Sequence, residues 1–256
     1  MKRELFVDTN VLLGLTFYSD RWFREARPAY DNGHKIHASD LVVYEYCCSP
    51  EPFSDPPENP GELDIDWSRD QGLVGRIRDR LSKPYREYRG EIRHSTREDL
   101  TLEDAIQKFI DIFAIREQAE PQVRQEFETE FADKAITRQY ITEFVSELID
   151  RILQAAEVMK QKLELRVQTH NSVYHEAEEV KQKWDDFPKN TPDEPDLSIV
   201  IDATRVIEEN SVNTLLSGDS DILALQEIAN EYFGFSILSM ADEYSVESGK
   251  RVSGGS

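Results

Sequence analysis

The sequence predicts an α/β protein with a central parallel sheet and helices on both faces of that sheet. Short apolar stretches alternate with helical patterns at both ends of the chain, and two of these stretches end in an aspartate. Such alternation is typical of parallel sheets, whose binding sites lie at the carboxyl ends of the strands. A long central segment has helical periodicity only, which indicates a helical insertion in an α/β core.

Four stretches have the length and apolar character of buried strands. The expected strands span residues 4–8, 35–39, 214–217 and 235–238. After the second strand, Ser39 or Asp40 can cap a helix that carries Glu45, and further helices are expected at residues 196–209 and 222–232. Asp8 and Asp219 then fall at the carboxyl ends of two strands, at the same edge of the sheet.

The middle of the chain differs from both ends. A proline-rich, acidic loop is expected at residues 50–66, and Thr101 with Asp104 forms a capping-box pattern before a helix. From Ile141 to Trp184 apolar residues recur at helical steps, interrupted by the polar residues 169–172. We therefore expect a core made of residues 1–49 and 190–248, a helical insertion at 50–189 and a flexible tail at 249–256.

Composition limits the classes of function. With 51 acidic and 30 basic residues the net charge is −21, which argues against general affinity for polyanions. No stretch has the roughly 18 apolar residues that span a bilayer, and Asp8 interrupts the N-terminal apolar run, so we expect a soluble cytoplasmic protein without a membrane partner. Basic residues are mostly Arg, with 19 Arg against 11 Lys, and this resembles the composition of proteins from very salty cytoplasm.

Six acids carry the chemistry that the sequence suggests. Any one of them alone could be a turn residue, a helix cap or a solvated helix position. Carboxylates at the ends of adjacent parallel strands, together with others from neighbouring helices, could not all stay ionised without a cation between them. Oxygen ligands suit hard cations, so the sequence predicts Mg²⁺ or Mn²⁺ as the cofactor. The six are Asp8, Glu45, Asp196, Asp202, Asp219 and Asp221.

The strings FVDTNVLL, VVYEY and PDLSIVIDATRVIEENSVNTLLSGDSDIL resemble the PIN-domain nuclease superfamily, and the last of them resembles its NYN branch. The resemblance implies a PIN-like three-layer α/β/α core. It assigns Asp8, Glu45, Asp196 and Asp219 as the catalytic, metal-binding acids, with Asp221 as a further metal ligand or a supporting residue. It also implies supporting roles in orienting the carboxylates for Thr9, Asn10 and Ser217.

The third acid is ambiguous between Asp196 and Asp202. Six residues separate them, nearly two helical turns, so both cannot simply contact one ion. We prefer Asp196, because an acid in the first helical turn points toward the strand ends and complements the helix dipole. Asp202 is then a supporting residue.

The resemblance implies a metal-dependent endoribonuclease, in which bound ions activate a water that attacks the phosphodiester. A structure-specific DNA nuclease and a catalytically silent scaffold module remain the alternatives. The small toxin-type members imply an antitoxin-like inhibitor, but the insertion here is much larger than theirs. The insertion could instead restrict access to the site, recruit a protein partner or hold the substrate.

One stretch is basic, unlike the rest of this acidic chain. Residues 69–97 hold nine basic and four acidic residues, with two tyrosines among the arginines. Aromatic rings among arginines are typical of surfaces that bind unpaired bases, so we expect single-stranded RNA as the substrate partner. The alternative is that this stretch packs against the acidic loop of the same chain. The expected nucleic-acid-binding residues are Arg76, Arg80, Lys83, Tyr85, Arg86, Tyr88, Arg89 and Arg93.

Overall fold

The computed structural model describes residues 3–50, 57, 59–95, 100–175, 182 and 194–241. Its centre is a five-stranded sheet in which every pair of neighbours is parallel, in the order β3-β2-β1-β4-β5. The α/β class with a parallel sheet is thereby confirmed. The strands are β1 (Glu4–Val7), β2 (Lys35–Ser39), β3 (Val167–His170), β4 (Thr214–Ser217) and β5 (Ser236–Ser239).

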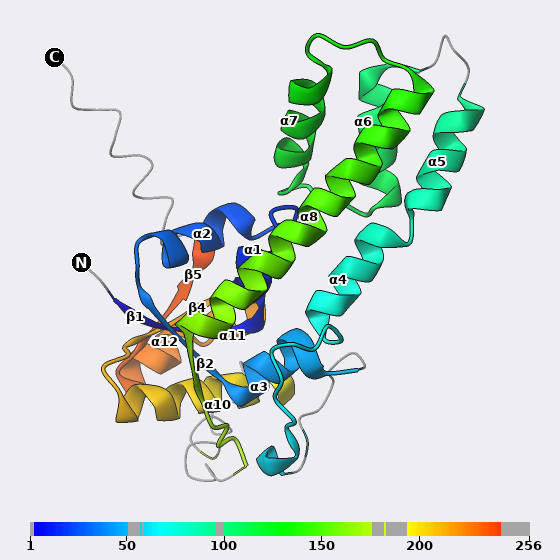
Figure 1. The fold of residues 1–256 in the computed structure, drawn as a ribbon. Coiled ribbons are helices and arrows are strands. Elements are labelled where there is room, and N and C mark those ends of the chain that lie inside the picture. The colour runs from blue at the N-terminus through cyan, green and yellow to red at the C-terminus, as the bar shows by residue number, and fades with distance from the viewer. Residues whose placement is uncertain are drawn as a thin grey trace, which may run out of the picture.

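Helices connect these strands and lie above and below them in Figure 1, α2 on one side and α10 on the other. The connections are α1 (Thr9–Thr16) and α2 (Phe23–Asp31) after β1, α3 (Asp40–Val43) and the π-helix η1 (Tyr44–Cys48) after β2, α10 (Glu194–Glu209) before β4, and α11 (Ser220–Leu223), α12 (Gln226–Ile228) and the π-helix η3 (Ala229–Phe233) before β5. The chain moves outward from β1 to β3 and then returns to β4. Ligands commonly bind at such a switch point, at the carboxyl ends of the strands on either side of it.

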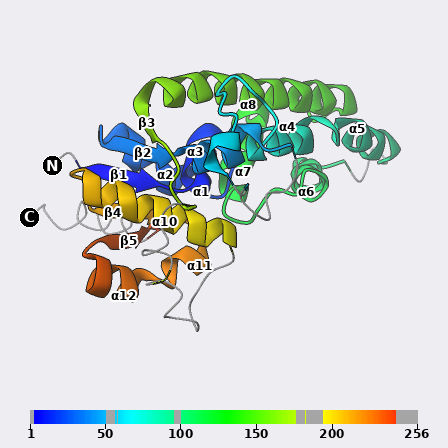
Figure 2. The same ribbon diagram turned by 90° about the horizontal axis from the view of Figure 1, so that it is seen from below.

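The middle of the chain is mostly helical and extends away from the sheet (Figure 1), whereas α10 and α12 stay beside the strands (Figure 2). Its elements are the short 3₁₀ helix η2 (Pro60–Glu62) and the helices α4 (Leu73–Ser82), α5 (Tyr85–His94), α6 (Leu102–Ile112), α7 (Glu120–Phe131) and α8 (Arg138–Arg166). The expected capping box of Thr101 and Asp104 is confirmed at the start of α6. Among the described helices, none combines the length and the apolar character needed to cross a membrane.

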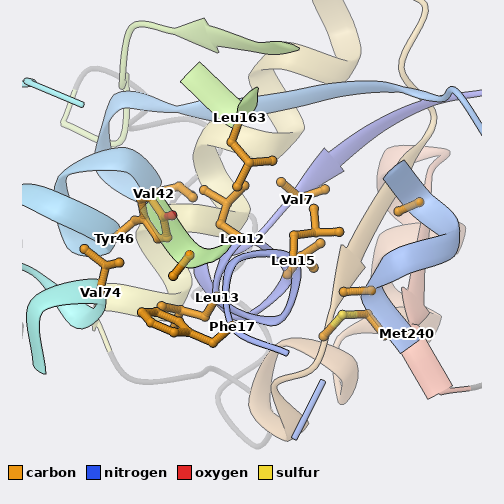
Figure 3. Close-up of a cluster of buried hydrophobic side chains, with 14 of the residues drawn as sticks. Val7, Leu12, Leu13, Leu15, Phe17, Val42, Tyr46, Val74, Leu163 and Met240 are labelled. Carbon is orange, nitrogen blue, oxygen red and sulfur yellow. The ribbon is translucent and has the colours of Figure 1, made fainter. Parts of the chain in front are cut away.

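One apolar core joins the sheet to these helices. Seven of the eight residues of α1 are buried, and Figure 3 shows Leu12 of α1 in the same cluster as Val7 of β1 and Leu163 near the end of α8. Farther out, the aromatic rings of Phe109, Phe127 and Phe144 stack edge to face and are buried as well. Helix α1 is therefore held tightly on the sheet, which matters because the site begins at its N-terminus.

The structure differs from the sequence prediction at the end of the long helix. The pattern from Ile141 to Trp184 predicted either one long helix or helices that fold back near residues 169–172, but α8 ends at Arg166, and Val167–His170 forms β3. This strand pairs with β2, with Val167 opposite Ile36. The free edge of β2 supplies hydrogen-bond partners for this short run, and Val and Thr favour extended backbone. The segment expected to be wholly helical therefore contributes one strand to the sheet.

The remaining element predictions have mixed outcomes. The strands at 35–39 and 214–217 are confirmed with the expected bounds. The expected helix at 222–232 is instead divided among α11, α12 and η3. The expected tail at 249–256 lies outside the described residues. So do residues 51–56 and 58 of the acidic loop expected at 50–66. The bounds of the core and of the insertion stay predictions.

Candidate metal centre

Asp8 connects β1 to α1 and is held from two sides. It is the N-cap of α1, and its Oδ1 accepts a hydrogen bond of 3.0 Å from the backbone N–H of Val11. Its Oδ2 accepts a hydrogen bond from the Ser217 hydroxyl at the end of β4. The side chain is buried. Two donors therefore fix the orientation of this carboxylate between the two strands.

Glu45 lies in the π-helix η1, and two other elements position it. The Thr9 hydroxyl, from the first residue of α1, donates a hydrogen bond to its Oε2. Gly72, just before α4, packs so closely on this turn that a Cβ there would lie 2.5 Å from the carbonyl oxygens of Glu45 and Tyr46. Only glycine allows that approach, so α4 begins directly against the turn that carries Glu45.

Asp196, Asp219 and Asp221 form the group closest to a metal-binding arrangement. Asp219 is the N-cap of α11, and its Oδ1 accepts a hydrogen bond of 2.8 Å from the backbone N–H of Asp221. Asp196 lies in the first turn of α10. The three residues each offer a carboxylate oxygen, and these oxygens lie within 4.8 Å of one another.

Electrostatic interactions link these three acids to Asp8 and Glu45. Burial, together with the charges of Asp219, Glu45, Asp8 and Asp221, raises the pKa of Asp196 to about 7. We call these five residues the acidic cluster; they come from four segments, namely the N-cap of α1, η1, α10 and the start of α11. Placing these carboxylates together favours a shared proton or a cation between them.

Asp8 and Glu45 respond to the same environment. The pKa of Asp8 is raised to about 6: burial is the largest cause, the hydrogen bonds from Ser217 and Val11 lower the pKa, and the charge of Asp219 raises it. Burial is also the largest cause of the raised pKa of Glu45. The hydrogen bond from Thr9 opposes that rise. Asp8 is buried and Glu45 is half-buried, and each carboxylate accepts a hydrogen bond from one hydroxyl.

A basic residue from the helical segment also reaches the acidic cluster. The charge of Arg76, in α4, lowers the pKa of Glu45, and burial in turn lowers the pKa of Arg76. The sequence suggested Arg76 as one member of a long basic stretch and gave no sign that it lies beside Glu45. The close approach of Gly72 explains how α4 brings it there.

Asp202 is held by a different set of groups. Its Oδ2 accepts a hydrogen bond from the Ser172 hydroxyl, and its Oδ1 accepts one of 2.8 Å from the backbone N–H of Val173. Burial raises its pKa to about 6, and a hydrogen bond from Ser39 opposes the rise. Asp202 therefore ties the segment after β3 to α10, and among the described residues it is Asp196 that lies with the other acids.

Two of the residues expected to support the acids, Thr9 and Ser217, contact them directly. Thr9 and Ser217 donate their hydroxyls to Glu45 and Asp8, as a role in orienting carboxylates requires. Asn10 is the second residue of α1 and is half-buried. Its supporting role stays a prediction.

The expected nucleic-acid-binding residues are only in part available at the surface. Tyr88 is fully buried, donates a hydrogen bond of 3.1 Å to the carbonyl of Ala105 and packs edge-on against Phe109. The expectation that it stacks on bases is wrong, because its ring belongs to the core between α5 and α6. Tyr85 is half-buried, and its hydroxyl donates to the carbonyl of Thr142 at 2.9 Å.

The charged members of the stretch have several environments. Lys83 pairs with Asp79 one helical turn before it, whereas three arginines on α5 are exposed, namely Arg86, Arg89 and Arg93. Arg69 pairs with Asp64 of the expected acidic loop. The alternative prediction, packing of the basic stretch against that loop, therefore describes Arg69 but not the exposed face of α5.

Comparisons of the chain with protein-family models, with curated proteins and with solved structures give no match.

Proposed function

We propose that this protein is a metal-dependent endoribonuclease that hydrolyses phosphodiester bonds of single-stranded RNA. The observation that carries the proposal is the acidic cluster at the carboxyl ends of β1 and β4, where five carboxylates from four segments interact. The strand order changes direction at this position, which is where α/β sheets bind ligands.

The donor set suits a hard divalent cation. It consists of carboxylate oxygens, which are the ligands preferred by Mg²⁺ and Mn²⁺. The residues that would hold the ion are Asp196, Asp219 and Asp221, with Asp8 and Glu45 beside them. When bound, such an ion lowers the pKa of a water molecule and neutralises charge that develops on the phosphoryl oxygens.

The other residues of the site supply orientation and positive charge. Ser217 and Thr9 hold Asp8 and Glu45 in fixed orientations, which keeps the carboxylates arranged before substrate binds. The charge of the Arg76 guanidinium lowers the pKa of Glu45, so the two side chains lie near each other. In this position it suits the non-bridging oxygens of a phosphodiester bound at the acids.

Two further observations support the choice of fold family and polymer. The DTN and SGDSD strings that resemble PIN-like nucleases both fall at the acidic cluster, in keeping with a PIN-like three-layer core. The exposed arginines of α5 offer contacts to a phosphate backbone outside the site.

The proposal is tested by cleavage of labelled single-stranded RNA and DNA with Mn²⁺, Mg²⁺ or EDTA, at low and at molar KCl. We expect RNA-selective internal cuts that EDTA abolishes and that Asp8→Asn reduces by at least about 100-fold. Asp150→Asn is the matched control, because it removes one exposed carboxylate from α8 and should leave the rate unchanged.

Each other outcome has a definite meaning. Cleavage of DNA in preference to RNA would keep the metal site and overturn the assigned substrate. No metal-dependent cleavage of either polymer by folded protein at either salt concentration would overturn the enzymatic proposal in favour of a scaffold module.

A further inference from the structure

A second site of opposite charge lies next to α4. A small pocket of about 40 Å³ opens between the loop after α1, helix α4 and the loop after α6. We call it the arginine pocket; its charged lining residues are Asp20, Arg21, Arg80 and Arg116. Three arginines and one aspartate therefore line this pocket in a chain whose net charge is −21.

The Asp20 carboxylate does not neutralise the charge of the three arginines. One of its oxygens already accepts a hydrogen bond of 2.9 Å from the backbone N–H of Trp22. Burial raises its pKa, and the charges of Arg21, Arg116 and Arg80 oppose that rise. Between them, the three arginines carry two more charges than the carboxylate can balance, which favours binding of an anion.

Two local features position the residues that line the pocket. Arg21 stacks on the Trp22 ring, with its guanidinium carbon 5.0 Å from the ring centroid. Across the pocket, Ala114 has a backbone φ of 49°, and this turn after α6 leads directly to Arg116. The left-handed conformation is costly for alanine, so packing of the neighbouring residues must hold this turn in place.

Two sets of contacts connect the arginine pocket to the acidic cluster. Arg76 and Arg80 are four residues apart in α4, so they share one face and lie roughly 6 Å apart along the helix axis. Arg76 acts on Glu45, as described above. On the other side, a Cβ at Gly218 would lie 2.6 Å from the Trp22 ring, so the ring that carries Arg21 packs on the residue before Asp219.

We propose that the arginine pocket binds a phosphate group of the same nucleic-acid strand whose neighbouring phosphodiester lies at the acidic cluster. The inference rests on the proposed nuclease function and adds a second anchoring point for the strand. Guanidinium groups bind phosphate oxygens in pairs and stay charged at any physiological pH. An anchor of this kind would hold an anionic strand against the repulsion of the surrounding acidic surface.

Binding in EDTA tests the inference without catalysis. The affinity for labelled single-stranded RNA is measured between roughly 50 and 200 mM KCl for wild type, Arg80→Ala, Arg116→Ala and the control Arg24→Ala. Arg24 is an exposed arginine of α2 outside the pocket, so its replacement removes the same charge elsewhere. Arg80 and Arg116 are themselves exposed, and thermal unfolding verifies that the variants fold.

We expect each pocket variant to weaken RNA binding on the order of tenfold and to lower the slope of log affinity against log salt by about 0.7, the value for one phosphate contact on a single strand. The control should leave the slope unchanged. Equal affinities and slopes for pocket variants and control would overturn the inference.

A second arm separates a strand phosphate from free phosphate. Inorganic phosphate is added and the rise in unfolding temperature is compared between wild type and Arg116→Ala. Loss of that rise in the variant, with RNA binding unchanged, would overturn the assignment to a strand and indicate a site for free phosphate. RNA binding that depends on the pocket, in a wild-type protein that does not cleave, would support the pocket and contradict the nuclease function.

Discussion

The Ser217 hydroxyl donates a hydrogen bond to the Asp8 carboxylate and accepts one of 2.9 Å from the backbone N–H of Asp219. A single buried serine thereby links the acids at the ends of two neighbouring strands. Because the hydroxyl has one proton to donate and its lone pairs to accept with, it can serve both groups at once. The relative placement of Asp8 and Asp219 thus depends on Ser217.

We predict that Ser217→Ala lowers metal affinity and nuclease activity by roughly 10- to 100-fold, the usual cost of losing a group that orients a ligand. Ser220→Ala is the control, because Ser220 is exposed at the start of α11 and should tolerate the change. Mn²⁺ titration and RNA cleavage are measured on both variants. Equal values for the two would show that Asp8 needs no orientation by the serine.

Gly72 gives a test of the contact between α4 and the turn that carries Glu45. We predict that Gly72→Ala destabilises the fold by about 1–3 kcal/mol, because its Cβ would press on the carbonyl oxygens of Glu45 and Tyr46. Cleavage should fall as well, since α4 carries Arg76. Gly90→Ala is the matched control: a Cβ there meets nothing within 4 Å, and we expect a gain of about 0.5–1 kcal/mol. Denaturant unfolding that finds both variants equally stable would contradict the close contact at Gly72.

Asp196 and Asp202 should respond to substitution in opposite ways. We predict that Asp202→Ala costs about 1–3 kcal/mol of stability, because Ser172 and the backbone N–H of Val173 lose their buried acceptor, while metal binding is kept. Asp196→Ala should abolish metal binding without destabilising the metal-free protein, because it removes one charge from a repelling group. Thermal unfolding and Mn²⁺ titration of both variants decide the matter, and the reverse pattern would make Asp202 the third metal acid.

Stability of the metal-free protein should fall as pH rises from about 4 to about 7. The folded-state pKa of Asp8 is raised to about 6 and that of Asp196 to about 7, so the folded protein binds more protons than the unfolded chain in this range. The stabilisation is complete below the unfolded pKa and is lost as pH passes through the folded values. We expect Mn²⁺ to restore the unfolding temperature at pH 7 and Asp8→Asn to reduce the pH dependence. A metal-free stability that rises over this range would contradict the crowding of carboxylates.

Local patterns were sufficient to predict most strands and caps. Alternation of short apolar stretches with helical periods located β1, β2 and β4, and the positions of Asp8 and Asp219 at strand ends followed from chain order alone. The capping box at Thr101 is equally local. These features depend on neighbours in sequence, which a single chain displays directly.

Contacts between distant segments could not be predicted in this way. The strand β3 contains two polar residues and a histidine, and only its pairing with β2 distinguishes it from a loop. Tyr88 lies in a stretch whose composition is typical of a binding surface, yet its ring is buried because α6 packs against it. Likewise, the approach of Arg76 to Glu45 depends on Gly72 contacting a π-helix that precedes it by more than twenty residues.

The most direct test of the acidic cluster is calorimetric titration of Mn²⁺ into wild-type protein and Asp219→Asn at pH 7. We predict saturable binding by the wild type and a loss of at least about tenfold in affinity for the variant, because Asp219 lies in the group of oxygens closest to one another. A folded wild-type protein that takes up no Mn²⁺, or a variant that binds it as well as the wild type, would contradict the assignment of this cluster as a metal centre.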